Sequence, residues 1–477
     1  MCTGLLGSAA GMDIHTADAK ASEEDVTVNS DYFPDSVFRN FISQNYDTNK
    51  NGILDSEEIE AATELVFTGS GLPEEKGNSW AEDTPDNREY LDVEGIQYLD
   101  NLKEVTLSGW YLKHAGRVKE LSGLEKLTLD YDDLDTIDIK GLKNLKSFRA
   151  AYNNLEKIDV SSNKKLTQLC VFQNQLQQLS LKNNKRITKL ICSYNEIEKL
   201  DVSNLKSLSS LDASNNDMSS LKLPETKKLR ELSLERNQLS SIGLSKYKAL
   251  TYCNLESNQL KSLDVSGNTK LTTLYLGFNK IKSLNLKKNK QLKELFFQVT
   301  GCEKLELTNL KKLEKLDCSH TLLDTLDLSK NKELLYLNCS AMNLETLDVS
   351  NQEGLLYLNC SFNALTKLDV SMCNELETLY CNNNSIEKLN LGTQTQLTGL
   401  YCYANAMTTL DISECTALDI MNSNQFQMYD SEYQYYSLED TTVKKIILPR
   451  SVYTQQVSQE DIEKYLLVNC VYSNYTA

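Results

Sequence analysis

A 21-residue spacing of apolar residues is the feature that most constrains how this chain of 477 residues can fold. A fixed period of this length is typical of solenoids, in which a repeat buries its apolar face only against its neighbours. Length alone suggests about three globular domains, but the period predicts about fifteen repeats in one elongated domain. The spaced anchors are Leu127, Phe148, Leu169, Leu190, Leu211, Leu232, Cys253, Leu274, Leu295, Leu316, Leu337, Leu358, Leu379 and Leu400, with Val105 before them and Met421 after them in a decayed repeat.

Each anchor belongs to the pattern LxxLxLxxN, as in residues 166–174. The two apolar residues of LxL face one side of a short strand, because side chains alternate across a strand. The Asn follows where the chain turns away, and its side chain can bond backbone groups that the turn leaves unpaired. Stacked repeats therefore predict a parallel sheet with an Asn ladder beside it. Other repeats end in Asn153, Asn195, Asn216, Asn237, Asn258, Asn279, Asn363, Asn384 and Asn405.

The second half of each repeat reads LxxLDVSxN, as in residues 260–268. Leu176, Leu179 and Leu181 show the same strand-like spacing there, and no segment is long enough for a helix on the convex side. We therefore expect a mainly β fold, with a parallel sheet on one face, extended segments on the convex face and only weak curvature.

Six of the 13 cysteines share one position of the repeat, two residues after the anchor. Other repeats fill this position with Leu107, Leu129, Val171, Ala213, Leu234, Leu255 or Leu276. We therefore expect Cys to act there as a small buried hydrophobe in reduced form. Disulfide bridges between neighbouring repeats are the alternative, because a parallel sheet brings these Cα atoms within bonding reach. The six residues are Cys192, Cys318, Cys339, Cys360, Cys381 and Cys402.

Residues 47–58 match the twelve-residue calcium loop of an EF-hand. Carboxylate and amide oxygens at the ligand positions suit a hard cation, and Gly52 permits the sharp turn in the loop. The predicted Ca2+ ligands are Asp47, Asn49, Asn51, Asp55 and Glu58, together with the backbone carbonyl of Ile53. The alternative is an acidic, Asn-rich turn that binds nothing. A single loop of this kind predicts a structural ion of modest affinity.

Helices are expected on both sides of this loop. The incoming helix starts near Pro34 and carries an apolar stripe of Val37, Phe38, Phe41 and Ile42. Asp55 and Glu58 also form a capping-box pattern at the start of the outgoing helix, with Ile59 and Ala62 facing inward.

The chain ends differ from the repeats in composition. Residues 1–21 combine a short apolar stretch with alternating small residues, which predicts the remnant of a secretory signal peptide and an exported protein; an uncleaved tail is the alternative. We expect a linker at 22–30, a helical cap at 31–90, and repeats at 91–425. Residues 426–477 are rich in Tyr and predict a C-terminal cap or the start of a further module, with a strand at 444–448 and a helix at 458–467.

Composition excludes several classes of function. The net charge of -17 disfavours binding to nucleic acid. The sequence contains no stretch of about 18 apolar residues, which is the length needed to span a membrane. Metalloprotease, nucleotide-binding and serine-hydrolase motifs are missing, so we expect no enzyme and no catalytic residues. We expect a monomer. His320 lies beside Ser319, and a solvated histidine explains it better than a catalytic one.

The residues on either side of each anchor point outward from the predicted concave sheet. In the C-terminal half many of them are aromatic, interleaved with Asp and Asn, which favours a protein- or glycan-binding surface. The high strand propensity of Tyr is the alternative explanation. The predicted contact residues are Tyr252, Tyr275, Phe296, Tyr336, Tyr357, Tyr380, Tyr401 and Tyr403. The N-terminal half offers Tyr131, Tyr152, Phe172 and Tyr194.

The motifs together resemble those of leucine-rich repeat proteins over roughly residues 91–425. With the EF-hand-like segment before the repeats, the chain is similar to bacterial surface proteins of the internalin-like kind. Its 21-residue period and LDVS half-motif depart from true internalins, so no internalin-type receptor carries over. The resemblance implies surface interaction or adhesion at the cell surface or outside the cell. An intracellular signalling scaffold is the alternative, and a lyase or hydrolase hidden on the repeat face is a third reading.

Overall fold

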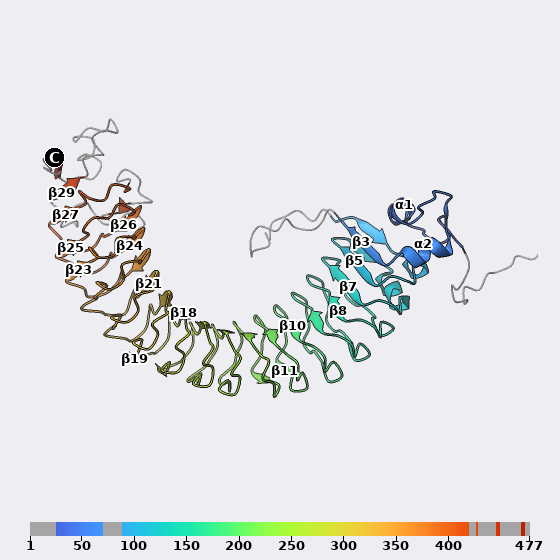
Figure 1. Ribbon diagram of the computed structural model, residues 1–477, viewed down its shortest axis with the longest axis horizontal. Helices are drawn as coiled ribbons and strands as arrows, with labels where there is room; N and C mark the ends of the chain where they lie inside the picture. Colours follow the sequence, from blue (N-terminus) through green and yellow to red (C-terminus); the bar gives the residue numbers. More distant parts are fainter. Residues whose placement is uncertain (1–24, 70–87, 419–425, 428–444, 449–468, 473–477) are drawn as a thin grey trace, which may run out of the picture.

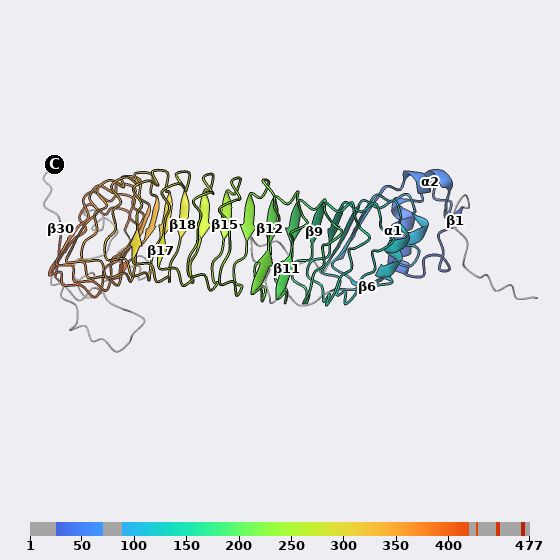
Figure 2. The same cartoon turned by 90° about the horizontal axis from the view of Figure 1, so that it is seen from below.

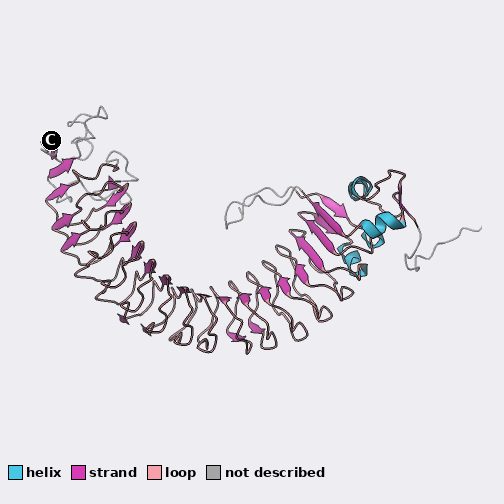
Figure 3. Ribbon diagram, viewed as in Figure 1, coloured by secondary structure: helices cyan, strands magenta, loops and turns pink. Residues whose placement is uncertain are grey.

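The computed structural model describes residues 25–69, 88–418, 426–427, 445–448 and 469–472. They form an arc-shaped solenoid whose main sheet lines the inner, concave side (Figures 1 and 3). All strands of this sheet pair in parallel with their neighbours, in the order of the chain. The strands are β3 (Glu64–Thr68), β5 (Glu104–Ser108), β7 (Lys126–Asp130), β8 (Ser147–Arg149), β9 (Gln168–Cys170), β10 (Lys189–Ile191), β12 (Ser210–Asp212), β14 (Glu231–Ser233), β15 (Tyr252–Asn254), β16 (Thr273–Tyr275), β18 (Glu294–Phe296), β20 (Lys315–Asp317), β21 (Tyr336–Asn338), β22 (Tyr357–Asn359), β24 (Thr378–Tyr380), β26 (Gly399–Tyr401) and β28 (Phe426–Gln427).

The second halves of the repeats are extended, as expected, but pair only in places. In each pairing the strands are parallel. The paired strands are β4 (Tyr90–Asp92) with β6 (Tyr111–Lys113), β11 (Lys199–Asp201) with β13 (Ser220–Lys222), β17 (Ser283–Leu284) with β19 (Lys304–Leu305), β23 (Lys367–Asp369) with β25 (Lys388–Asn390), and β27 (Thr409–Asp411) with β29 (Lys445–Leu448) and β30 (Asn469–Tyr472). The expected mainly β leucine-rich repeat solenoid is therefore confirmed.

The arc is strongly curved, and the expectation of weak curvature was wrong (Figure 1). Seen from below, the same solenoid runs as a straight band, so the bend lies in one plane (Figure 2). The main sheet is hydrogen-bonded from β3 to β28, which fixes the concave spacing of neighbouring strands near 4.8 Å. The outer face lacks such a continuous ladder in the described residues, so its segments are free to spread apart. Unequal spacing of the two faces bends the solenoid with the sheet inside.

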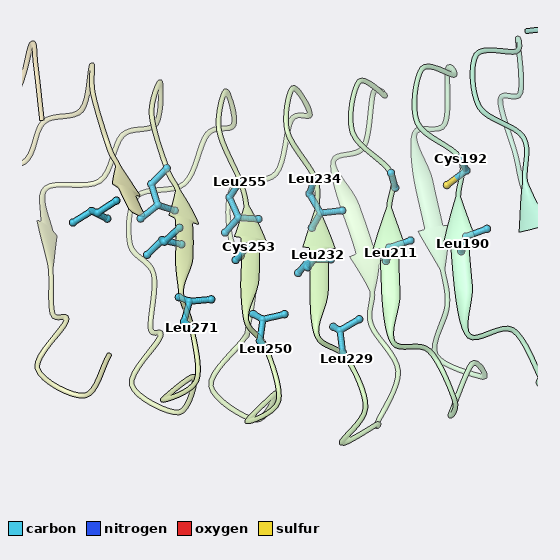
Figure 4. Packing of buried hydrophobic residues seen from close by; sticks show 14 of the residues in the cluster. Leu190, Cys192, Leu211, Leu229, Leu232, Leu234, Leu250, Cys253, Leu255 and Leu271 are labelled. Carbon is cyan, nitrogen blue, oxygen red and sulfur yellow. The ribbon is translucent and has the colours of Figure 1, made fainter. Parts of the chain in front are cut away.

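The core is a column of side chains between the two faces. Every anchor from Leu127 to Leu400 is buried, and so are the residues two positions further along. Cys192 and Leu234 fill that second position in different repeats and lie beside the anchors of their strands (Figure 4). The cysteines between Cys170 and Cys415 are buried free thiols, which agrees with the reduced form expected from the sequence. Burial raises the pKa of Cys253, Cys360 and Cys402 to about 12.

Two buried ladders of amide side chains run along the solenoid. The first amide ladder follows the exit from each main strand and consists of Asn153, Asn174, Asn195, Asn216, Asn237, Asn258, Asn279, Asn363, Asn384 and Asn405. The second amide ladder precedes the entry to the main strands and consists of Asn163, Asn184, Asn268, Asn289, Asn331, Gln352 and Gln394. Both donate from their side-chain nitrogens to main-chain carbonyls of the preceding turn. The sequence predicted the first ladder but not the second.

The N-terminal cap holds α1 (Ser36–Asn45) and α2 (Ser56–Ala61), so both expected helices are present. The N-cap of α1 is Asp35, whose carboxylate accepts hydrogen bonds from the N–H groups of Val37 and Phe38. The Asp55–Glu58 capping box of α2 is also present. Short 3-10 helices, η1 (Ile96–Tyr98) and η2 (Ala115–Glu120), accompany the first turns of the solenoid.

Three details of the cap differ from the sequence-based expectation. Val37 is exposed rather than part of the buried stripe, while Phe38 and Ile42 are buried. Residues placed in a linker form β1 (Val26–Thr27), which pairs antiparallel with β2 (Ile53–Leu54). The cap also contributes β3, the first strand of the main sheet, although this region was expected to be helical.

The C-terminal region continues the solenoid where the structure describes it. The strand expected at 444–448 is present as β29, which stacks in parallel on β27 and β30. Met421 and the helix expected at 458–467 lie outside the described residues, as do residues 1–24. Within the described residues no helix is long and apolar enough to cross a membrane.

Candidate ligand-binding face and calcium loop

Seven of the eight predicted contact residues form a continuous row of rings on the concave sheet, which we call the aromatic ladder. Each ring lies directly before or after a buried anchor, and each is half-buried. The members in order are Tyr252, Tyr275, Phe296, Tyr336, Tyr357, Tyr380 and Tyr401. Tyr403 is also half-buried, but it follows the last of these strands rather than lying within it.

The aromatic ladder alternates between two columns. Where two neighbouring rings share a column they stack, with centroids 4.9 Å apart for Tyr275–Phe296, 4.6 Å for Tyr336–Tyr357 and 4.2 Å for Tyr380–Tyr401. Where the ladder crosses between columns, the centroids lie 5.8 to 6.3 Å apart and the rings are tilted. One crossing, from Phe296 to Tyr336, passes over strand β20, which carries Lys315 and Asp317 instead of aromatic residues.

Stacking determines which part of each ring can meet a ligand. The planes of Tyr380 and Tyr401 are 3° apart and those of Tyr336 and Tyr357 are 7° apart, so these ring faces cover one another. A sugar stacks on an open aromatic face, and within each of these pairs one face of each ring is covered by its partner. Burial, assisted by the neighbouring tyrosine, raises the pKa of Tyr357 and Tyr380 to about 12. Their hydroxyls are neutral near pH 7, as they would be at the ordinary tyrosine pKa of about 10.

Carboxylates lie beside the aromatic ladder on the same face. Asp317 accepts hydrogen bonds from Ser319 and from Asn338 Nδ2, at 2.7 and 3.0 Å. Glu256 accepts one from Gln298 Nε2 at 3.4 Å. Burial raises the pKa of Glu256, and the charges of Glu235 and Asp317 raise it further. These side chains form a polar strip next to the rings.

A second aromatic row lies in the N-terminal half, at the turns that leave the strands. Tyr131 stacks on Tyr152 with centroids 4.0 Å apart, and Phe172 contacts both Tyr152 and Tyr194 edge-on. Tyr131, Tyr152 and Tyr194 have left-handed backbone conformations, each with a φ between 56° and 60°. The sequence identified these four residues as aromatic candidates, but it did not show that they lie at the turns after the strands rather than on the strands themselves.

The predicted calcium loop closes on itself through its own ligands. The carboxylate of Asp47 accepts the N–H groups of Asn51 and Gly52 at 3.1 and 2.9 Å. Asn51 Oδ1 accepts the N–H of Ile53 at 2.8 Å, and Asn49 Nδ2 donates to Asp55 Oδ2 at 3.3 Å. Gly52 has a φ of 79°, as the sharp turn requires.

Glu58 lies at the end of the loop and bonds back to its start. Its Oε1 accepts the Thr48 hydroxyl at 2.8 Å and the Thr48 N–H at 2.7 Å, and its Oε2 accepts the N–H of Asp55 at 3.2 Å. Burial opposes ionisation, but these hydrogen bonds outweigh it and lower the pKa of Glu58. The carboxylate is therefore ionised near pH 7 and already directed into the loop.

The donor set of the loop consists of hard oxygen atoms, which fits Ca2+. Over the described residues, however, no three Asp, Glu, His or Cys side chains converge as a ready metal cluster. Asp47 and Glu58 spend their oxygens on loop N–H groups, and two of the predicted ligands are Asn amides. Glu58 Oε2 accepts only one hydrogen bond from the described residues, so this oxygen retains a lone pair for an ion.

Neither a protein-family model nor a curated protein matches this sequence. Solved structures with a similar fold include the functional domain of InlJ from Listeria monocytogenes, which includes a cysteine ladder. It is 24% identical, with 84% of this chain and 80% of that chain covered and a TM-score of 0.68. A leucine-rich repeat protein of Leptospira interrogans is 20% identical over 87% of this chain and 97% of its own, with a TM-score of 0.58.

YopM from Yersinia enterocolitica is a third similar structure. It is 24% identical, covers 65% of this chain and 70% of its own length, and has a TM-score of 0.54. At this level of identity the three likenesses establish the leucine-rich repeat fold and no more.

Proposed function

We propose that this protein binds a protein ligand through the aromatic ladder on its concave face. The observation that carries the proposal is the unbroken row of seven half-buried rings along the inner side of the arc. Tyrosine is enriched at the energetic centres of protein interfaces, because it combines a large apolar body with a hydroxyl group. A concave, repetitive surface also offers many contacts to one extended partner.

The covered ring faces favour a protein over a glycan as the ligand. Stacking in the Tyr336–Tyr357 and Tyr380–Tyr401 pairs reduces the open ring area available to a sugar, whereas the side chains of a polypeptide can pack against ring edges as well. The resemblance to bacterial surface proteins of this fold supports an exported protein that interacts at the cell surface or outside the cell. A monomer with its concave face free is part of the same proposal.

The test uses the full chain on protein and glycan arrays, followed by affinity measurements on each hit. Replacing Tyr336, Tyr357 and Tyr380 by Ala should weaken protein binding by about tenfold or more, because these rings occupy the centre of the proposed interface. Tyr90→Ala is the matched control, since Tyr90 is an exposed tyrosine away from the ladder. Unchanged affinity in the triple variant, with an unchanged melting temperature, would contradict the proposal.

We further propose that one Ca2+ ion braces the N-terminal cap, held by Asp47, Asn49, Asn51, Asp55, Glu58 and the carbonyl of Ile53. The ion would contribute a fixed charge that draws these oxygens together. Supporting this role, the loop connects α1 to α2 and pairs through β2 with β1, so ordering it orders the cap. Millimolar calcium should therefore raise the melting temperature of the cap.

The loop variant Asp47→Asn with Glu58→Gln separates the ion from the fold of the loop. It removes two charges from the ligand set and keeps one acceptor oxygen of each side chain, so the calcium-free melting temperature of each protein serves as the reference for its own calcium-dependent shift. We expect the calcium-dependent shift to vanish in this variant while magnesium and sodium shift neither protein. A wild-type melting temperature that ignores millimolar calcium would refute the calcium site.

A further inference from the structure

The exposed large apolar side chains of the solenoid are concentrated in a few central turns. Six of them flank the aromatic ladder and are between 37% and 58% exposed, and we call these the apolar rim. Phe278, Val299, Leu322 and Phe362 lie at the turns where the chain leaves the strands, and Leu335 and Leu356 lie where it enters them. The rim therefore borders Tyr275, Phe296, Tyr336 and Tyr357 on both sides.

The fold does not require apolar residues at these places. The position of Phe278 and Val299 is filled in other turns by Gln173, Asn215, Arg236 or Asn383. The position of Leu335 and Leu356 is filled elsewhere by Thr251, Lys293 or Glu377. Burial cannot explain the rim either, because its side chains are exposed.

Val299 has an unfavourable backbone conformation, and its apolar side chain is unfavourably exposed to solvent. Its φ is 53°, in the left-handed region that β-branched residues rarely adopt. Asn and Gly tolerate this conformation, and Asn fills the same position at Asn215 and Asn383. A residue that suits neither its conformation nor its exposure is expected where a partner covers it.

The carboxylates next to the rim lack cationic partners. Among the ion pairs formed by the described residues, none includes Asp212, Glu256 or Asp317. Their hydrogen-bond partners are Ser, Asn and Gln side chains and N–H groups. Arg236 lies close enough to lower the pKa of Glu256. Burial and the charges of Glu235 and Asp317 raise it, so carboxylates outnumber cations around this side chain and leave a negative potential there.

From this combination we propose that the ligand is a polypeptide segment that carries both apolar and basic side chains, docked across the central turns. Its apolar residues would cover the rim and the ring edges, and its Lys or Arg residues would pair with Glu256 and Asp317. The proposal rests on the proposed concave-face function and specifies its partner. Charge complementarity and the exposed rim together select this partner over an acidic protein or a neutral glycan.

The experiment selects peptides from a random library displayed on phage, with the full chain as target. We expect the selected peptides to combine Lys or Arg with apolar residues, and their affinity to fall as ionic strength rises. Val299→Asn should weaken binding by about tenfold without destabilising the fold, because it removes a rim side chain and suits the left-handed backbone. Asn215→Ala, in the same turn position outside the rim, should change binding less than about twofold.

A pair of charge variants distinguishes the site from the acidic protein as a whole. Glu256→Gln and Asp264→Asn each remove one negative charge, but Asp264 lies in the LDVS half of its repeat and bonds only its own turn. Weakening of about tenfold by Glu256→Gln alone supports the proposal. Equal weakening by both variants overturns it, because attraction to the net charge of -17 would then suffice.

The outcomes also separate this inference from the function on which it rests. Peptides that depend on Tyr336, Tyr357 and Tyr380 but are acidic or uncharged overturn the inference and leave the binding face intact. If no selected peptide depends on these tyrosines, both proposals fail. Glycan-array hits that depend on the aromatic ladder overturn the polypeptide partner.

Discussion

The two amide ladders are built from the same kind of side chain but differ in how many hydrogen bonds each side chain makes. In the first amide ladder, Asn216 Nδ2 donates to the carbonyls of Cys192, Ala213 and Ser214, and its Oδ1 accepts the N–H of Ile197. In the second, Asn268 Nδ2 donates to the carbonyls of Leu244 and Tyr247, while its Oδ1 has no hydrogen-bond partner in the described structure.

The carbonyls reached by the two ladders differ as well. Leu244 O and Tyr247 O already accept main-chain N–H groups, so Asn268 adds a second donor to each. The main-chain hydrogen bonds of the described residues include none to Cys192 O or Ala213 O, which accept from Asn amides. Where Asn is present, the first ladder therefore supplies donors that these carbonyls would otherwise lack, whereas the second ladder adds donors to carbonyls that are already bonded. The sequence shows that the second ladder's position also accepts apolar residues. These are Leu142, Leu205, Leu310, Cys373 and Cys415.

The largest expected loss of stability is in the first ladder. Asn216→Ala should lower the free energy of unfolding by about 2 to 3 kcal/mol, because the buried Ile197 N–H loses its only partner and the carbonyls of Cys192 and Ala213 each lose one of two Asn donors. Urea denaturation measures the loss, and amide hydrogen exchange at Ile197 should accelerate selectively. An effect below about 1 kcal/mol would contradict the distinction between the ladders.

Asp132 extends the comparison, because it occupies the first ladder's position ahead of Asn153. Its Oδ1 accepts the Trp110 N–H, and its Oδ2 is buried without a hydrogen-bond partner. Burial raises the pKa of Asp132 to about 9, and the charge of Asp130 contributes. The folded protein therefore holds a proton that the unfolded chain releases near pH 4.

This proton makes stability fall as pH rises from about 4 towards about 9, since only the folded state binds it in that window. Asp132→Asn should abolish this dependence and raise the free energy of unfolding at pH 7 by about 2 to 4 kcal/mol. Melting temperatures of both proteins across this pH range provide the measurement. Parallel pH profiles would show that Asp132 is ionised in the folded state.

In three further turns a residue other than Asn stands at the first ladder's position. Replacing such a residue by Asn is expected to give a smaller increase in the free energy of unfolding. The hydroxyl of Thr321 donates to Cys318 O within its own turn, as Thr300 does to Phe297 O. Thr321→Asn would add donors and an acceptor that reach the preceding turn, and should stabilise the protein by about 1 kcal/mol. Chemical denaturation against Thr325→Asn, an exposed control, tests this. A loss of stability would mean that the turn cannot accommodate the amide.

The smallest effect is expected in the second ladder. Asn268→Leu should change the free energy of unfolding by less than about 1 kcal/mol, because the lost hydrogen bonds are offset by removing an unpaired buried oxygen. Comparing it with Asn237→Leu in the first ladder isolates the position from the substitution. If both variants lower the free energy of unfolding equally, the two ladders contribute equally to stability and the distinction between them is wrong.

The sequence predicted the repeat, its anchors and the first amide ladder, because a side-chain period repeated many times leaves one way to bury the apolar face. It also named the rings of the aromatic ladder, since residues beside a buried anchor must point away from the core. It predicted the helix before the calcium loop from Pro34 and an apolar stripe, and the helix after the loop from its capping box.

Other features depended on distances between turns, which no local pattern contains. The strong curvature arises from unequal hydrogen bonding on the two faces, and β3 joins the main sheet across residues 70–103. Whether Tyr336 and Tyr357 stack or stand apart depends on their shared column, and the hydrogen bond from Gln298 to Glu256 depends on the neighbours of Glu256 in space. The sequence by itself determined which side chains leave the core, because that follows from alternation along one strand. Only the tertiary structure decided which of them meet, because that follows from the packing of one turn on the next.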